Sequence, residues 1–203
     1  MLIDMATLMD RYKPDITGIL HVGAHMAEEY EDYSLAGVEK VVWVEANIDL
    51  VKKLEEERLP SHQTVVHAVV GDTNGEQVTF NISNNGQSSS VLELGTHKTA
   101  HPEVHYVDSR KMKTSRLDTI YATMEISGLN FMNLDIQGAE LLALKGLGKR
   151  LDEFDYIYSE VNREELYVDC CLVDELDEFL SDFDRVETEW TSFGWGDAFY
   201  VRR

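Results

Sequence analysis

The sequence contains few cysteines, prolines and cationic residues. Among 203 residues there are 2 cysteines, 3 prolines, and 18 Lys plus Arg against 38 Asp plus Glu, which gives a formal net charge of −20. The two cysteines, Cys170 and Cys171, are adjacent, and such a pair supplies neither a disulfide framework nor a zinc site. The acidic excess predicts no nucleic acid and no membrane as partner, because both of those polyanionic surfaces select basic proteins.

Long apolar runs are also missing. No run approaches the roughly 18 residues that span a bilayer, and the first 15 residues lack the basic and apolar regions of a signal peptide. Together with the few cysteines, these absences predict a cytoplasmic protein. A chain of 203 residues is long enough to bury its own core, so we expect a single domain over 1–203. The oligomeric state is left open.

What the sequence does contain is an alternation of apolar and amphipathic segments. Near-continuous apolar runs are typical of parallel strands that are buried on both faces, and apolar residues at spacings of three and four are typical of helices. The first 72 residues therefore predict a βαβαβ arrangement behind a short helix. The runs lie at 16–25, 40–47 and 64–72, and the helical spacing at 2–12, 26–37 and 48–58.

The second part of the chain continues the alternation after an insertion. Residues 76–82 alternate polar and apolar side chains, which predicts a half-exposed strand and begins a small insertion over about 76–113. Ser115 and Asp118 have the spacing of a helix capping box. We expect an α/β domain that closes on an antiparallel hairpin. The further elements are a helix after Ser115, strands at 129–135 and 156–161, helices at 139–147 and 172–181, and the hairpin at 183–190 and 197–203.

The ends of the first two strands carry the first functional signal. Ligands of an open parallel sheet bind beyond the carboxyl ends of its strands. Gly23 closes the first strand, and Glu45 ends the second 22 positions later, where an acidic side chain can accept hydrogen bonds from both hydroxyls of a ribose. The turn has only one glycine, so a nucleoside without a pyrophosphate fits better, which favours S-adenosylmethionine over NAD or ATP. The alternative is a tight turn at Gly23 and a solvated strand end at Glu45.

Residues 133–146, NLDIQGAELLALKG, resemble the hallmark motif of the FkbM family of S-adenosylmethionine-dependent methyltransferases. Further motifs follow the family order, and the resemblance covers roughly residues 17–161. Two positions depart from it: His21 stands where most members have an acidic residue, and Gln137 stands at a Glu-like position. The matching motifs are HVGAH at 21–25, VEAN at 44–47, AVVGD at 68–72, the serines at 88–90, SRLDTI at 115–120, and YSEV at 158–161.

The resemblance implies a fold, a cofactor and a reaction. The fold is the Rossmann-like α/β sandwich of class I methyltransferases, with three layers and a mostly parallel seven-stranded sheet that ends in an antiparallel hairpin. The cofactor is S-adenosylmethionine, and the reaction is methyl transfer to a hydroxyl of a sugar, glycan or related small molecule. The residues assigned to the cofactor are His21, Gly23, Ala24, His25, Glu45, Ala46, Asn47, Ala68, Val69, Asp72 and Asp135.

Asp135 and Glu160 are the predicted catalytic residues. They end neighbouring strands, so their carboxylates should converge, which suits either a general base or a divalent metal ion. A metal is possible here, but none is predicted. Glu140 is a third base candidate, although an acidic residue in the first turn of a helix is more often structural. The polar loop residues Asn84, Ser88, Ser89 and Ser90 are assigned to the acceptor.

Two other functions stay open at this stage. The pairing of Gly23 with Glu45 also suits an NAD-dependent oxidoreductase with a Rossmann-like fold, although two of the usual three glycines are missing. A non-catalytic protein that binds a nucleoside would keep the same residues. Stabilisation by S-adenosylhomocysteine, by NAD or by neither would separate the three hypotheses.

Overall fold

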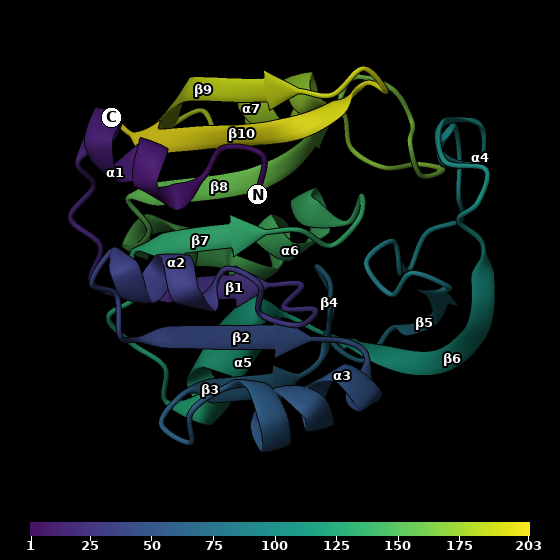
Figure 1. Cartoon of the computed structure of the whole chain (residues 1–203), viewed down its shortest axis with the longest axis horizontal. Coiled ribbons are helices and arrows are strands. Elements are labelled where there is room, and N and C mark those ends of the chain that lie inside the picture. The colour runs from purple at the N-terminus through teal and green to yellow at the C-terminus, as the bar shows by residue number, and fades with distance from the viewer.

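The computed structural model describes residues 1–203. Its main sheet has seven strands in the order β3-β2-β1-β7-β8-β10-β9 (Figure 1). All neighbours run parallel except β10, which is antiparallel to both β8 and β9. The predicted sheet and its closing hairpin are confirmed. The strands are β1 Ile19–Val22, β2 Val41–Glu45, β3 Thr64–His67, β7 Phe131–Leu134, β8 Tyr156–Asn162, β9 Phe183–Trp190 and β10 Trp195–Arg202.

Helices cover both faces of this sheet. A cluster of 23 buried residues joins one face to α5, α6 and α7, and a cluster of 15 joins the other face to α1, α2 and the turn η1. The result is the predicted three-layer arrangement. None of the helices has the length and apolar character that a membrane span requires. The helices are α1 Met5–Tyr12, α2 Tyr30–Leu35, α3 Ile48–Lys53 with the π-helical turn η1 Leu54–Arg58, α5 Leu117–Met124, α6 Glu140–Leu147 with the 3-10 turn η2 Gly148–Glu153, and α7 Val173–Phe179.

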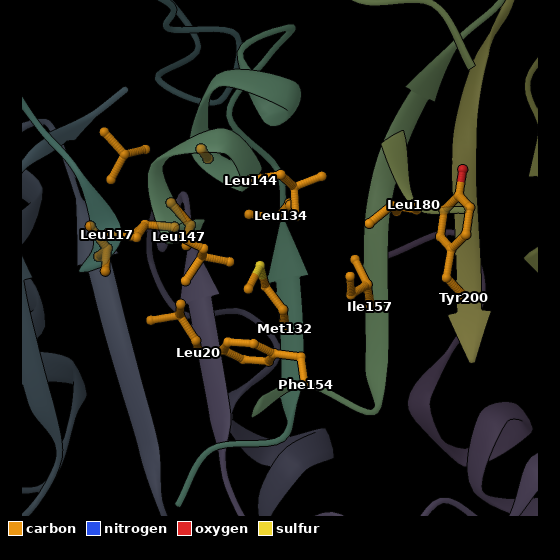
Figure 2. Packing of buried hydrophobic residues seen from close by; sticks show 14 of the residues in the cluster. Leu20, Leu117, Met132, Leu134, Leu144, Leu147, Phe154, Ile157, Leu180 and Tyr200 are labelled. Atoms are coloured by element: carbon orange, nitrogen blue, oxygen red, sulfur yellow. The ribbon is translucent and has the colours of Figure 1, made fainter. Parts of the chain in front are cut away.

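The larger cluster explains why the central strands are so apolar. Leu20, Met132 and Ile157 project from three adjacent strands towards the side chains of the covering helices (Figure 2). Leu144 and Leu147 of α6 meet them, and all five side chains are completely buried. Truncation of one such leucine to alanine costs about 2–5 kcal/mol. The rigid strands therefore hold their carboxyl ends at fixed positions along one edge of the sheet.

The third predicted strand is divided in two, which corrects the continuous strand expected over 64–72. β3 pairs with β2 in the main sheet, whereas β4 (Val69–Val70) pairs with Thr114 and Ser115 of a separate sheet. The chain changes sheets at Ala68, whose backbone N–H still donates to the carbonyl oxygen of Glu45. The division accompanies this tertiary pairing, since the run contains no proline or glycine before Gly71 that would break the strand.

The insertion forms a small sheet of its own. β5 (Gln77–Ser83) and β6 (Tyr106–Ser115) pair antiparallel, and the order of the sheet is β4-β6-β5. A single helical turn, α4 (His97–Ala100), lies between them in the chain. Figure 1 shows this sheet and α4 beyond the carboxyl ends of β1, β2 and β7. The insertion is therefore placed over the edge at which ligands of such sheets bind.

Two helix boundaries differ from the expectation. The helix expected over 26–37 begins only at Tyr30, because His25 and Ala27 have positive φ angles of 43° and 51° and interrupt helical backbone. Ser115 does not cap α5. It ends β6, Arg116 occupies the N-cap position, and the Asp118 carboxylate pairs with the guanidinium of Arg116 at 2.7 Å.

Candidate active site

A narrow cavity, which we call the slot, lies where the small sheet meets the main sheet. Gly23 and the side chain of Glu45 line it from the main sheet, with Val44 beside them. Phe80 of β5 and Val91 of the insertion line it from the small sheet. No Lys or Arg is among its lining residues. A pyrophosphate needs cationic groups or a glycine-rich cradle. The slot therefore suits a flat apolar ring attached to a polar group that carries no phosphate.

Glu45 is held rigidly at the wall of the slot. Its side chain is buried, and its two carboxylate oxygens accept the backbone N–H groups of His25 at 2.8 Å and Asn47 at 2.7 Å. Burial raises the pKa of this carboxyl, while the two backbone N–H donors oppose the shift. A carboxylate fixed in this way presents its remaining lone pairs in one direction, as recognition of a vicinal diol requires.

Gly23 is required by the fold itself. It has a φ of +93°, and a Cβ atom there would lie 1.8 Å from the carbonyl oxygen of Asp135. Only glycine combines that backbone conformation with such a close approach. The turn after β1 and the turn after β7 can thus meet directly, which brings Asp135 to the mouth of the slot.

A larger cavity of about 430 Å³, which we call the cleft, opens beside the slot. Its volume lies within the range of small-molecule sites. Gly23, His25, Gln87 and Asp135 line both cavities. These four residues mark the junction at which molecules in the two cavities would touch.

Asp135 and Glu160 converge in the cleft, as the sequence predicts for two neighbouring strand ends. The Nε2 group of Gln137 donates to Asp135 Oδ1 at 2.6 Å and to Glu160 Oε2 at 2.9 Å. The Gln137 Oε1 atom accepts from the hydroxyl of Tyr167. Gln137, which has a φ of 57°, therefore connects both carboxyls to the framework.

Both carboxyls have raised pKa values. The walls of the cleft desolvate Asp135, although its side chain is open to solvent, and raise its pKa to about 6, with repulsion from Asp197 adding to the effect. Glu160 is buried, and desolvation followed by repulsion from Asp135 raises its pKa well above the usual value. Asp135 is therefore the carboxyl that can exchange a proton with a molecule in the cleft near neutral pH, whereas burial favours the protonated form of Glu160.

Glu140, the third base candidate, has a different environment. It is fully buried, and its Oε1 atom accepts the backbone N–H groups of Ile136 at 3.0 Å and Gly138 at 3.1 Å. Burial raises its pKa to about 7. It lines neither cavity, so its contacts hold the turn after β7 rather than a ligand.

The other assigned residues fall into three groups. Ala46, Ala68, Val69, Ser89 and Ser90 line the slot, and His21 and Ser88 line the cleft. Ala24, Asn47, Asp72 and Asn84 line neither.

The residues outside the cavities have other contacts. Asn47 caps α3 by accepting from the backbone N–H of Asp49. Asn84 bonds with the backbones of Glu103 and His105, which ties the two ends of the insertion loop together.

Several lining residues were not identified from the sequence. Phe80 had a signal, because the alternation of 76–82 puts it on the inward face of a half-exposed strand. Asp197 had none. It faces the cleft because β10 pairs antiparallel with β8 in a register that places it opposite Glu160, and its carboxylate accepts from the hydroxyl of Tyr158. No three His, Cys, Asp or Glu side chains are grouped so that they could hold a metal ion.

Comparisons with known proteins agree with this geometry. A profile of the FkbM methyltransferase domain matches residues 21–187. An S-adenosylmethionine-dependent methyltransferase from Anabaena variabilis superimposes with a TM-score of 0.54 at 8% identity, over 100% of this chain and 85% of that one. The magnesium protoporphyrin IX methyltransferase of Synechocystis, solved with bound S-adenosylmethionine, gives a TM-score of 0.52 at 12% identity, over 98% and 76%.

A weaker match is M. capricolum TrmK in complex with S-adenosylhomocysteine, with a TM-score of 0.45 at 8% identity. It covers 92% of this chain, which spans 62% of TrmK. The comparison with curated protein sequences found no match.

The fold, with a slot and a cleft that meet at the carboxyl edge of the sheet, is that of the class I methyltransferases. Within this class, the chain belongs to the FkbM methyltransferase family, whose profile covers most of it. The family decides among the functions that the sequence left open in favour of the methyltransferase.

Proposed function

We propose that this protein transfers a methyl group to a hydroxyl of a sugar, a glycan or a related small molecule. The observation that carries the proposal is the junction of the two cavities at Asp135, an ionised carboxylate that faces the cleft. An O-methyltransferase needs a nucleophile aligned with the methyl group and an acceptor for the hydroxyl proton. The junction provides a place for both.

The slot fits the adenosine part of the cofactor. We assign Glu45 to the ribose hydroxyls, and Ala68, Val69 and Phe80 to the faces of the adenine, because a rigid carboxylate and an apolar wall stand at these places. Gly23 and His25 then lie at the junction, next to the methionine part. S-adenosylmethionine, when bound, supplies an electrophilic methyl group on a sulfonium.

Asp135 acts as the general base in this proposal. It accepts the hydroxyl proton as the acceptor oxygen bonds to the methyl carbon and the carbon–sulfur bond breaks. Gln137, whose amide donates to both carboxyls, holds the Asp135 carboxylate in position, and Glu160 anchors that amide from its buried side. Ser88, on the cleft wall, is proposed to contact the acceptor.

We also propose that the whole chain, 1–203, works as one methyltransferase domain in the cytoplasm, with the insertion as a cover over the slot. Both cysteines are free thiols, which suits a reducing compartment.

Mass spectrometry tests the reaction. We expect a gain of one methyl group on a hydroxylated acceptor in the presence of S-adenosylmethionine, and none with Asp135→Asn. Thermal shift tests the cofactor, since specific binding stabilises the fold by mass action. A shift with NAD and none with S-adenosylhomocysteine would contradict the assignment of the slot.

A further inference from the structure

The cleft has carboxyl groups on every side and no cationic side chain of lysine or arginine. Its acidic lining residues come from the turn before α2, the insertion, the turn after β7 and the strands β8 and β10, so the charge is not a property of one helix face. Six carboxylic acids take part: Glu28, Glu29, Glu103, Asp135, Glu160 and Asp197.

Contacts within the chain neutralise only part of this charge. Glu28 pairs with His25 at 2.6 Å, and Glu29 pairs with the amine of Met1 at 3.4 Å. Asp135 and Asp197 have neutral donors instead, the amide of Gln137 for the first and the hydroxyl of Tyr158 for the second. Neither of these two carboxyls forms a salt bridge. The amine of Met1 attracts both of them from a distance, and His101 lies 3.7 Å from Glu103, but the carboxyls outnumber the cations, so the cleft keeps a net negative potential.

A second observation points to a ligand in the same cavity. His97 of α4 lies on the cleft wall, is 4% exposed, and has an Nδ1 atom without a hydrogen-bond partner. Burial, followed by repulsion from His101, lowers the pKa of His97, so the ring is neutral. Buried polar atoms almost always have partners, and a neutral imidazole suits the hydroxyl of a bound molecule.

We propose that the acceptor is a hydroxylated molecule that carries an amine, such as an amino sugar, and not one that carries phosphate or another anionic group. This inference rests on the methyl transfer proposed above. A cleft walled by one sign of charge concentrates ligands of the opposite sign. Recognition of a phosphate requires arginine, lysine or a nest of backbone N–H groups, and the cleft has neither cation.

A charge series on one sugar ring tests the inference. The full chain, saturated with S-adenosylhomocysteine, is titrated with glucosamine, N-acetylglucosamine and N-acetylglucosamine 6-phosphate, and binding is followed by NMR chemical shifts of the protein. We expect glucosamine to bind at least about tenfold more tightly than N-acetylglucosamine, with a preference that shrinks as salt is added. The phosphate should bind most weakly.

A pair of matched variants sharpens the test. Glu103→Gln removes a carboxylate at the exposed rim of the cleft. It should lower the affinity for glucosamine about threefold and leave the affinity for N-acetylglucosamine unchanged. Glu56→Gln makes the same change on the exposed face of η1, away from the cleft, and should change neither affinity.

The possible outcomes separate this inference from the proposed function. Glucosamine binding that does not exceed that of the neutral or phosphorylated sugar, including no binding at all, overturns the inference. Failure of S-adenosylhomocysteine to bind, measured first by calorimetry, contradicts the cofactor assignment instead.

Discussion

The slot and the cleft adjoin each other but are built in different ways. The slot is shaped mainly by backbone and apolar side chains at the ends of β1, β2 and β4. Its acidic lining residues are Glu45 and Asp135. The cleft is shaped by polar and charged side chains from segments between Met1 and Asp197. If the slot binds the cofactor and the cleft binds the acceptor, as proposed, the difference teaches that the fold recognises the cofactor, whereas side chains added to the fold recognise the acceptor.

The largest expected effect distinguishes the two carboxyls of the cleft. Asp135→Asn removes the base and should lower kcat by about 10²- to 10⁴-fold. Glu160→Gln keeps the shape of a buried carboxyl that only anchors Gln137 in this proposal, and should lower kcat less than about tenfold. Steady-state kinetics on both variants, with melting temperatures as a control for folding, measure the difference. Equal losses would show that the roles of the two residues are assigned wrongly.

The next effect tests whether backbone shape controls the slot. Gly23→Ala places a Cβ against the Asp135 carbonyl at a positive φ and should reduce the free energy of unfolding by roughly 3 kcal/mol or more. Gly37→Ala is the matched control, because Gly37 has a φ of +81° and no atom within 4 Å of the added Cβ. It should cost about 1 kcal/mol. Urea unfolding measures both, and equal costs would mean that the close approach is unimportant.

Removal of the Glu45 charge from the slot should affect the binding of the cofactor and not that of the acceptor. Glu45→Gln should lower the affinity for S-adenosylhomocysteine about 10- to 100-fold, as expected for the loss of hydrogen bonds to a charged group. Glu103→Gln, in the cleft, should leave that affinity unchanged. Calorimetry measures both. If Glu45→Gln bound the cofactor normally, the ribose would have to lie elsewhere.

The smallest effect concerns pH. A base must be ionised, so kcat/KM should fall as pH falls through the Asp135 pKa of about 6, by tenfold for each unit below it. Gln137→Glu would place a further carboxyl against Asp135 and raise this pKa, which moves the acidic limb to higher pH by about one unit. A pH–rate profile of both proteins measures the shift. An acidic limb that stays in place would mean that another group controls it.

The difference between the slot and the cleft also explains how much of each could be predicted from the sequence. Gly23 and Asp135 directly follow an apolar strand and Glu45 ends one, so their positions at one edge follow from local patterns and from the parallel topology. The alternation of strands and helices and the closing hairpin were predicted for the same reason, whereas the seven-stranded sheet was implied by the resemblance to the FkbM family. The main residues of the slot could therefore be predicted from the sequence.

The remaining features depend on contacts between distant segments. The run TVVHAVV is continuous in sequence and mostly apolar, and it divides at Ala68 where Thr114 and Ser115 pair with its second half. Asp197 and His97 reach the cleft through strand register and the path of the insertion. No local pattern encodes such long-range contacts, and for that reason the cleft was predicted least well.

The insertion is joined to the main sheet by short connections, and this has an evolutionary consequence. Its chain leaves the main sheet at Ala68 and reaches α5 at Arg116, and within these bounds it contributes Phe80 to the slot and His97 and Glu103 to the cleft. Loops on a rigid scaffold tolerate change more readily than the scaffold itself. A gene that exchanged the part with His97 and Glu103 and retained Phe80 would change the proposed acceptor site in one step and keep the proposed cofactor site.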